Sequence, residues 1–289
     1  MEKKKTVFVT GATSQTGSRL VKRLIEKAYF VKCLIHTKEH QERLPKTGIS
    51  PVFGSLDKPD ALSEFLRNID VLINTAHIRF AKNIINLCRM SSIKRVIFLS
   101  STRRFTKFPC NSAKEVIDGE ELIQNSGLDW TILRETMIYG GPEDNNVNKI
   151  MHIISRIPVF PLFRGGRNLI QPVFVWDVVD AIISAVENPI SILKIYNIGG
   201  PEAITYKEFI QTIANALNKK IIFIPLPLAP AIFILKIYEK LFPKSFITSE
   251  QLKRLEEDKA IDISLAKEEL KFSPISFKNG ISLKMKGEI

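Results

Sequence analysis

Short apolar runs alternate with segments of helical periodicity through the first half of the chain. The runs are rich in Val, Ile and Leu on both faces, which is typical of parallel strands that helices cover on each side. The pattern predicts strands over Lys5–Thr10, Val31–Ile35, Pro51–Phe53, Asp70–Asn74, Arg95–Ser100 and Trp130–Arg134. It predicts helices over about Gln15–Ala28, Glu39–Leu44, Pro59–Arg67, Phe80–Met90 and Ala113–Asn125. This alternation indicates an α/β fold with a doubly wound parallel sheet of the Rossmann type.

After Tyr139–Pro142 the alternation becomes less regular and prolines become frequent. Helices are expected at about Val147–Arg156, Asp177–Glu187, Tyr206–Leu217, Pro230–Leu241 and Ser249–Asp258, with short strands near Gln171–Val175, Lys194–Ile198 and Ile221–Ile224. Frequent prolines are typical of a lobe whose elements are joined by many loops. We therefore expect a main domain over residues 1–140 and a smaller C-terminal α+β lobe over residues 141–289, which binds substrate and interleaves with the main sheet.

The chain carries 42 Lys and Arg against 30 Asp and Glu, a formal net charge of +12. Nine of the basic residues lie between Val71 and Lys114, where there is no Asp or Glu. Such a stretch raises the local positive potential and favours phosphate-bearing ligands, with a solvated basic surface as the alternative. No zinc-finger, recognition-helix or ribonucleoprotein motif accompanies the charge, so nucleic acid is not expected as a partner.

The three cysteines, Cys33, Cys88 and Cys110, lie far apart, and the four histidines are scattered. Neither pattern supports a disulfide framework or a metal site, so no metal is expected. The folded pattern begins close to Met1, which leaves no room for a signal peptide, and no apolar stretch is long enough for a membrane span. The expected location is the reducing cytoplasm.

Small residues lie between the first strand and the first helix, in Thr10-Gly11-Ala12-Thr13-Ser14-Gln15-Thr16-Gly17. Glycines here let the backbone turn tightly and approach a pyrophosphate, whose charge then faces the helix N-terminus. The hydroxyl of Ser14 can cap the helix or contact a phosphate. The alternative is a plain strand–helix turn. The residues expected to bind the pyrophosphate of a dinucleotide are Gly11, Thr13, Ser14, Gln15, Thr16 and Gly17.

This segment resembles the Gly-rich loop of the short-chain dehydrogenase/reductase superfamily, in its extended and atypical branches. The resemblance covers nearly the whole chain, through Leu72–Ala76, Phe98–Ser101, Leu128–Arg134, Met137–Gly140, Gln171–Val178 and Tyr196–Thr205. These branches include NAD(P)-dependent nucleoside-diphosphate-sugar epimerases and dehydratases, NmrA-like regulators and an NADPH-binding accessory subunit of respiratory complex I. The resemblance implies a nicotinamide dinucleotide cofactor, with Asn74 and Ala76 on its adenosine side. For an active member it implies hydride removal at a sugar hydroxyl, followed by return or elimination.

The end of the second strand bears on which dinucleotide is bound. In relatives that prefer NAD, an acidic residue there binds the ribose hydroxyls. This chain has no carboxylate in that stretch before Glu39. Arg19, together with His36 or Lys38, can instead pair with a 2′-phosphate, so NADP(H) is favoured over NAD(H). The alternative is that these residues are ordinary surface charges.

Family members that transfer hydride usually carry Tyr-x-x-x-Lys on a helix, after a Ser or Thr at the end of the fifth strand. The lysine holds the nicotinamide ribose and lowers the pKa of the tyrosine, which then serves as an acid or base. The matching window here is Cys110-Asn111-Ser112-Ala113-Lys114, so Ser101 and Lys114 remain while Cys110 replaces the tyrosine. A cysteine is too short to reach a carbonyl placed for tyrosine. Cys110 is either packing or an unusually acidic thiol.

Three interpretations follow, with Ser101, Lys114 and Cys110 as the candidate catalytic residues. Another group, such as Glu115, Thr102 or a hydroxyl near Ser101, acts as the acid or base. Alternatively, NADP(H) is an internal cofactor that does not exchange. In the third interpretation the chain is a non-catalytic sensor or assembly factor that binds the dinucleotide.

Two features of the second half concern partners. Arg164 and Arg167 flank a glycine pair and are expected to clamp the diphosphate of a nucleotide sugar, or another phosphorylated sugar; a solvated loop is the alternative. Residues 221–242 are strongly apolar, with lysines near their end. We expect them to pack on the core of the lobe, and the alternative is peripheral contact with an anionic inner membrane surface and a lipid-linked substrate. The sequence does not determine the oligomeric state.

Overall fold

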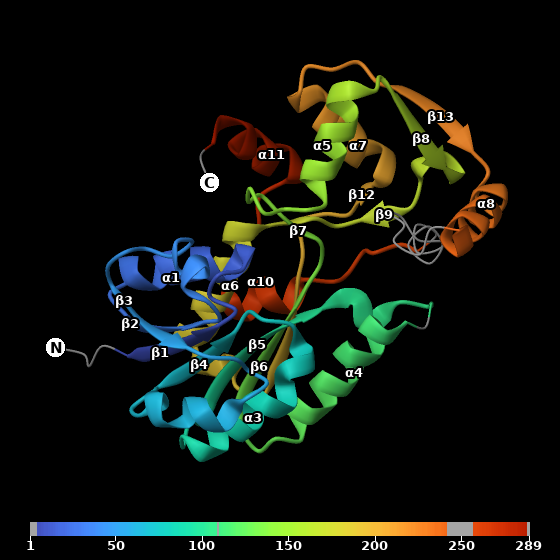
Figure 1. Ribbon diagram of the computed structural model, residues 1–289. Helices are drawn as coiled ribbons and strands as arrows, with labels where there is room; N and C mark the ends of the chain where they lie inside the picture. The colour runs from blue at the N-terminus through green and yellow to red at the C-terminus, as the bar shows by residue number, and fades with distance from the viewer. Residues whose placement is uncertain (1–4, 109, 242–256, 288–289) are drawn as a thin grey trace.

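The structure is a computed structural model that describes residues 5–108, 110–241 and 257–287. Its centre is a seven-stranded parallel sheet in the order β3-β2-β1-β4-β5-β6-β11 (Figure 1). The order reverses between β1 and β4, as in a doubly wound sheet. The strands are β1 (Thr6–Thr10), β2 (Phe30–Ile35), β3 (Ile49–Phe53), β4 (Val71–Asn74), β5 (Arg95–Ser101), β6 (Asp129–Glu135) and β11 (Lys194–Ile198).

Helices cover both faces of this sheet, because the strands are apolar on both sides. One face packs against α1 (Gln15–Glu26), α6 (Val175–Glu187) and α10 (Ser264–Leu270). The other face packs against α3 (Ala81–Met90), α4 (Asn111–Gln124) and the 3₁₀ helix η1 (Pro59–Leu66). The predicted Rossmann-type α/β fold is confirmed.

The second lobe has its own core of aromatic side chains, in which Phe209 stacks on Phe277 with ring centroids 4.7 Å apart. Three small strand pairs frame it, and Figure 1 shows them grouped away from the main sheet. The pairs are β7 (Ile138–Tyr139) with β10 (Val173–Phe174), β9 (Leu169–Ile170) with β12 (Ile204–Thr205), and β8 (Val159–Phe163) with β13 (Ile222–Leu226). The helices are α5 (Val147–Arg156), α7 (Tyr206–Ala216), α8 (Leu228–Leu241) and α11 (Phe277–Lys286).

The structure differs from the sequence-based expectation mainly in the second lobe. The strand expected at Gln171–Val175 is the short β10, and Val175 already begins α6. The strands β7, β8, β9 and β12 and the helices α10 and α11 were not expected. Residues 249–256 of the helix expected at Ser249–Asp258 lie outside the described residues. The two-part division at residue 140 stays a prediction, since β11, α6 and α10 come from the second half of the chain and pack with the main sheet.

All seven strands of the main sheet end at one edge, which we call the carboxyl edge. The chain leaves β6 at this edge and enters the second lobe through β7. The loops after β1, β2, β4, β5 and β6 lie at the same edge, because the strands are parallel. Ligands of doubly wound sheets bind outside the carboxyl ends of the strands, next to the point where the strand order reverses. None of the described helices is long and apolar enough to cross a membrane.

Candidate functional site

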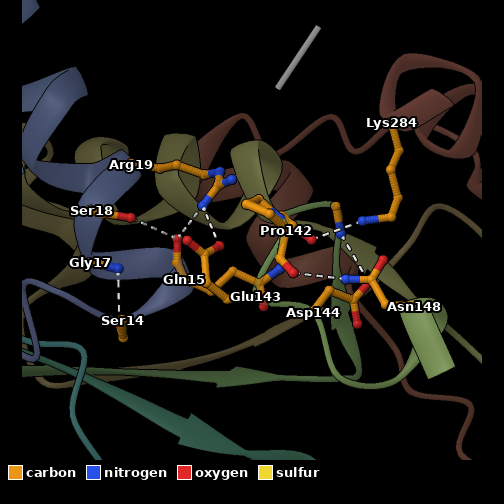
Figure 2. Close-up of polar contacts among 12 residues, drawn as sticks. Ser14, Gln15, Gly17, Ser18, Arg19, Pro142, Glu143, Asp144, Asn148 and Lys284 are labelled. Atoms are coloured by element: carbon orange, nitrogen blue, oxygen red, sulfur yellow. Dashed lines mark hydrogen bonds and ion pairs between the residues drawn. The ribbon is translucent and has the colours of Figure 1, made fainter. Parts of the chain in front are cut away.

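The turn from β1 to α1 needs glycine at two positions because backbone atoms lie close to both. Gly11 has φ of 70°, in the left-handed region, and a Cβ there would lie 2.5 Å from the Ala76 nitrogen. A Cβ at Gly17 would lie 2.1 Å from the Gly11 carbonyl oxygen. Ser14 caps α1 by accepting a hydrogen bond of 3.0 Å from the Gly17 N–H (Figure 2). The predicted glycine cradle is therefore formed, and the N-terminus of α1 opens directly after the carboxyl end of β1.

The first turn of α1 offers hydrogen-bond donors to a ligand. The amide nitrogen Nε2 of Gln15 is buried and has no hydrogen-bond partner among the described residues. The first N–H groups of a helix lack intrahelical acceptors, and the helix dipole adds partial positive charge. Thr13, Ser14 and Gln15 are partly exposed, and Thr16 is buried. This donor set fits a pyrophosphate, which the cradle residues would hold; their role in binding stays a prediction.

Arg19 lies against the second lobe (Figure 2). Its guanidinium donates to the Gln15 carbonyl at 2.9 Å and lies 3.5 Å from the Glu143 carboxylate, in the loop after β7. The side chain is almost fully buried, and its Nε has no hydrogen-bond partner among the described residues. None of the interactions among the described residues joins Arg19 to His36 or Lys38. The contact of Arg19 with a 2′-phosphate stays a prediction, and in this structure Arg19 links the cradle to the second lobe.

The end of β2 carries the other groups expected near the adenosine ribose. His36 and Lys38 are exposed there, on either side of Thr37. The Thr37 hydroxyl is buried without a hydrogen-bond partner among the described residues. Glu39, the first carboxylate after β2, is exposed in the short helix α2 (Lys38–Gln41). The local arrangement fits a phosphorylated ribose, because two basic side chains are exposed at the end of β2 and an unpaired hydroxyl lies between them.

Asn74 supports the cradle from the end of β4. It is fully buried, and its Oδ1 accepts hydrogen bonds from the Thr10 hydroxyl at 2.7 Å and from the Ala76 N–H at 3.2 Å. Its Nδ2 donates to the Ala76 carbonyl at 3.0 Å. Both amide atoms of Asn74 are thus engaged by the protein. The adenosine contact expected for Asn74 and Ala76 stays a prediction, while the close approach of the Ala76 backbone to Gly11 is observed.

The candidate catalytic residues lie around the end of β5 and the start of α4. Ser101 ends β5, is partly exposed, and accepts a hydrogen bond of 3.3 Å from the Arg103 N–H. Cys110 has extended backbone and is the N-cap of α4, with its sulfur 3.3 Å from the Ser112 hydroxyl. Lys114 is exposed in the first turns of α4. The Cys110 carbonyl accepts a hydrogen bond of 3.1 Å from the Lys114 N–H, and the catalytic roles of Ser101, Cys110 and Lys114 stay predictions.

A buried carboxylate that the sequence analysis missed holds this region together. Glu120 of α4 is fully buried and accepts a hydrogen bond of 2.5 Å from the Ser100 hydroxyl. Arg134 of β6 donates to both of its oxygens, with a shortest distance of 2.6 Å, and Arg104 also pairs with it. Glu120 thus joins β5, β6, α4 and the segment that follows β5. Its place on the apolar face of a helix was the one signal of this role in the sequence.

Arg164 and Arg167 lie in the second lobe, on the turn between β8 and β9. Both side chains are exposed, and Arg164 has φ of 50°. The turn packs against β13 and α7 of the second lobe. The structure leaves both guanidinium groups accessible, as a phosphate clamp requires, and their role toward substrate stays a prediction.

His77 follows β4 and pairs with Glu115 of α4 across 3.8 Å. Burial lowers the pKa of His77 below its ordinary value, against the opposing influence of Glu115. The described residues contain no group of three or more His, Cys, Asp or Glu side chains that could hold a metal ion.

Known proteins resemble the chain in sequence and in fold. Residues 11–152 match the family model described as NAD(P)H-binding. The UDP-glucose 4-epimerase of Vibrio cholerae is 25% identical over 93% of this chain and 91% of its own length. The photosystem II assembly factor Ycf39 of Cyanophora paradoxa is 27% identical over 44% of each chain. The solved structure of UDP-glucuronic acid 4-epimerase from Bacillus cereus, in complex with UDP-glucuronic acid and NAD, superposes with a TM-score of 0.76 at 18% identity, covering 97% of this chain and 98% of that chain.

The fold and the glycine cradle define a Rossmann-type dinucleotide-binding protein. The NAD(P)H-binding match over residues 11–152 and the similarity to sugar epimerases support the resemblance found in the sequence to extended short-chain dehydrogenases/reductases.

Proposed function

We propose that the protein is an NADP(H)-dependent oxidoreductase of the epimerase or dehydratase type that acts on a nucleotide sugar or a related phosphorylated sugar. The observation that carries the proposal is the cradle of Gly11, Ser14 and Gly17 at the N-terminus of α1, with the unused Gln15 amide beside it. The cofactor supplies a reversible hydride acceptor when it is bound. The chain supplies the pyrophosphate site, the substrate site and the proton transfer.

The nucleotide sugar is proposed from charge and from similarity. Arg164 and Arg167 present two exposed guanidinium groups in a second lobe, and such groups match a diphosphate. The similar Vibrio cholerae protein is a UDP-glucose 4-epimerase. Ser101 at the end of β5 and Lys114 of α4 are the proposed catalytic pair, with Lys114 toward the nicotinamide ribose. Cys110 is proposed to line the same site.

Native mass spectrometry of the purified chain tests the cofactor first, because a bound dinucleotide adds a defined mass and copy number. Turnover of a panel of nucleotide sugars then tests the reaction, with Lys114→Ala as the variant expected to lose activity. A chain that retains the dinucleotide and turns over a panel member supports the proposal. A chain that binds no dinucleotide contradicts it.

The preference for NADP(H) is proposed from His36 and Lys38 at the end of β2. Lys38→Glu should weaken NADPH binding about tenfold, since it removes a charge-assisted contact with the 2′-phosphate, and it should leave NADH binding nearly unchanged. Isothermal titration calorimetry measures both affinities. Lys46→Glu, at another exposed lysine, is the matched control. Equal affinities of the unaltered chain for NADPH and NADH would contradict the preference.

Peripheral membrane contact is proposed for residues 221–242, of which Phe242 lies outside the described residues. Alternate residues of β13 present apolar side chains to solvent, with Ile222 63% and Ile224 44% exposed. Lysine residues nearby would favour anionic lipid. A lipid-linked sugar would then be the substrate, with the protein on the inner membrane surface or in the cytoplasm. Co-sedimentation with anionic liposomes that does not exceed sedimentation with neutral liposomes would contradict this contact.

The second candidate function is a non-catalytic NADP(H) sensor or assembly factor. Cys110 stands where a catalytic tyrosine is expected and lies outside the helix that carries Lys114. The chain is also similar to an assembly factor of photosystem II over part of its length. A bound dinucleotide that stays unreacted across the whole sugar panel would favour this function.

A further inference from the structure

Glu135 is the last residue of β6 and lies at the carboxyl edge. Its register partners are Ser101 of β5 on one side and Ile198 of β11 on the other. Side chains alternate between the two faces of a strand, so Glu135 shares its face with Leu133, which packs in the core formed with α1 and α6. Ser101 shares a face with Leu99 of the same core. Glu135 and Ser101 are therefore neighbours on one face of the sheet. Ser101 lies one strand away from β4, and Glu135 lies two strands away.

One oxygen of the Glu135 carboxyl group has no partner within the described part of the fold. Its Oε2 is buried and has no hydrogen-bond partner among the described residues. The Thr102 hydroxyl donates to the Glu135 backbone carbonyl, at 3.2 Å, and not to its side chain. Buried polar atoms are normally paired, so an unpaired carboxyl oxygen at the ligand-binding edge calls for a ligand or a function. Burial raises the pKa of Glu135 to about 8, opposed in part by its own backbone N–H.

The other acid–base candidates near this edge are less available. Cys110 precedes α4 and lies beside Ser112. Glu115 pairs with His77. Tyr139 is fully buried in the core of the second lobe, where its ring packs on Phe277. Glu135 combines a buried carboxyl oxygen, unpaired among the described residues, with a position next to Ser101.

We propose that Glu135 is the acid–base residue of the hydride-transfer step, in the role that tyrosine has in related enzymes. The proposal rests on the proposed function. When the sugar is oxidised, the substrate C–H bond breaks with its electron pair leaving as hydride to the oxidised dinucleotide, and the hydroxyl proton passes to the Glu135 carboxylate. In the return direction the carbonyl carbon receives the hydride, and Glu135 returns the proton to the carbonyl oxygen. Protons and electrons balance in both directions.

The pH dependence has a defined sign. Oxidation of the sugar requires the carboxylate, so its rate should rise with pH through about 8, and reduction should fall over the same range. Glu135→Gln keeps the size of the side chain and removes the titration. It should lower the single-turnover rate of dinucleotide reduction by roughly 10²–10⁴-fold and abolish the pH step, with dinucleotide affinity unchanged. Glu135→Asp should keep the step at a reduced rate.

Folding stability gives a readout independent of turnover. Between the ordinary pKa of a glutamate and about 8, the folded chain holds a proton at Glu135 that the unfolded chain has released. The free energy of unfolding of the unaltered chain should therefore fall as pH rises through that window. Glu135→Gln removes this contribution, so its Tm relative to the unaltered chain should rise from pH 5 to pH 9. Glu121→Gln, at an exposed position of α4, is the control.

The outcomes separate this inference from the proposed function. Loss of the rate and of its pH step in Glu135→Gln, with the Tm shift, supports Glu135 as the acid–base residue. A Glu135→Gln rate within threefold of that of the unaltered chain overturns this inference, while the proposed function stands. The inference is also overturned if Glu115→Gln loses as much rate as Glu135→Gln and Glu135→Gln keeps the pH step. A dinucleotide-loaded chain whose cofactor stays unreacted with every sugar of the panel overturns both.

Discussion

Gly11 has a left-handed φ and lies against the backbone of Ala76, so two separate costs should follow its replacement. Gly127 has a similar φ, 74°, but a Cβ there would meet no atom within 4 Å. Gly127→Ala should cost about 1 kcal/mol of unfolding free energy, from the left-handed conformation alone. Gly11→Ala should cost at least about 3 kcal/mol and abolish dinucleotide binding, because the Ala76 backbone must also move.

Chemical denaturation and calorimetric titration with NADPH measure the two effects. Equal destabilisation by the two alanines would show that the contact with Ala76 is unimportant. The glycine spacing of the cradle could be predicted from the sequence because the requirement is local. The engagement of Asn74 could not, since its partner Thr10 lies on another strand, 64 residues away.

At the scale of elements, Glu120 connects α4 to two strands through Ser100, Arg104 and Arg134. Glu120→Ala should destabilise the protein by about 3–5 kcal/mol, because it leaves two guanidinium groups next to a buried cavity without their shared carboxylate. The neighbouring Glu121 is exposed, and Glu121→Ala should change the stability by less than about 0.5 kcal/mol. Urea denaturation compares the two. A loss of less than about 1 kcal/mol in Glu120→Ala would contradict the structural role of this carboxylate.

The strands of the main sheet could be predicted from the sequence because each is a compact apolar run with a turn after it. The elements of the second lobe are harder to predict from the sequence, since β7, β9, β10 and β12 have only two residues each and depend on pairing with distant segments. The same limit applies to the site. Glu135 follows Arg134 in sequence, yet only the pairing of β6 with β5 shows that it lies beside Ser101.

At the scale of the whole molecule, the cradle and the second lobe meet where Arg19 contacts Glu143 (Figure 2). Within the second lobe, Lys284 of α11 holds the same loop by donating to the Gly141 carbonyl at 2.8 Å. Burial lowers the pKa of Lys284 below its ordinary value. Lys284→Met should remove this hydrogen bond, lower the stability by about 1 kcal/mol and speed amide hydrogen exchange in residues 141–148.

Hydrogen exchange followed by mass spectrometry measures the local effect. Lys286→Met, on the same helix and exposed, should leave that segment as it is in the unaltered chain. Identical exchange in the two variants would show that the Lys284 contact does not restrain the loop. Neither this contact nor that of Arg19 with Glu143, 124 residues apart, is visible in the periodicity of the chain.

The position of β11 has a consequence for synthesis. This strand closes the free side of β6, but it comes from residues 194–198, long after the other six strands have left the ribosome. A nascent chain that has reached residue 140 therefore exposes the unpaired backbone of β6 and invites association with neighbouring chains. A truncated gene product that stops there should accumulate in inclusion bodies, whereas one extended past α6 and β11 has β6 paired on both sides.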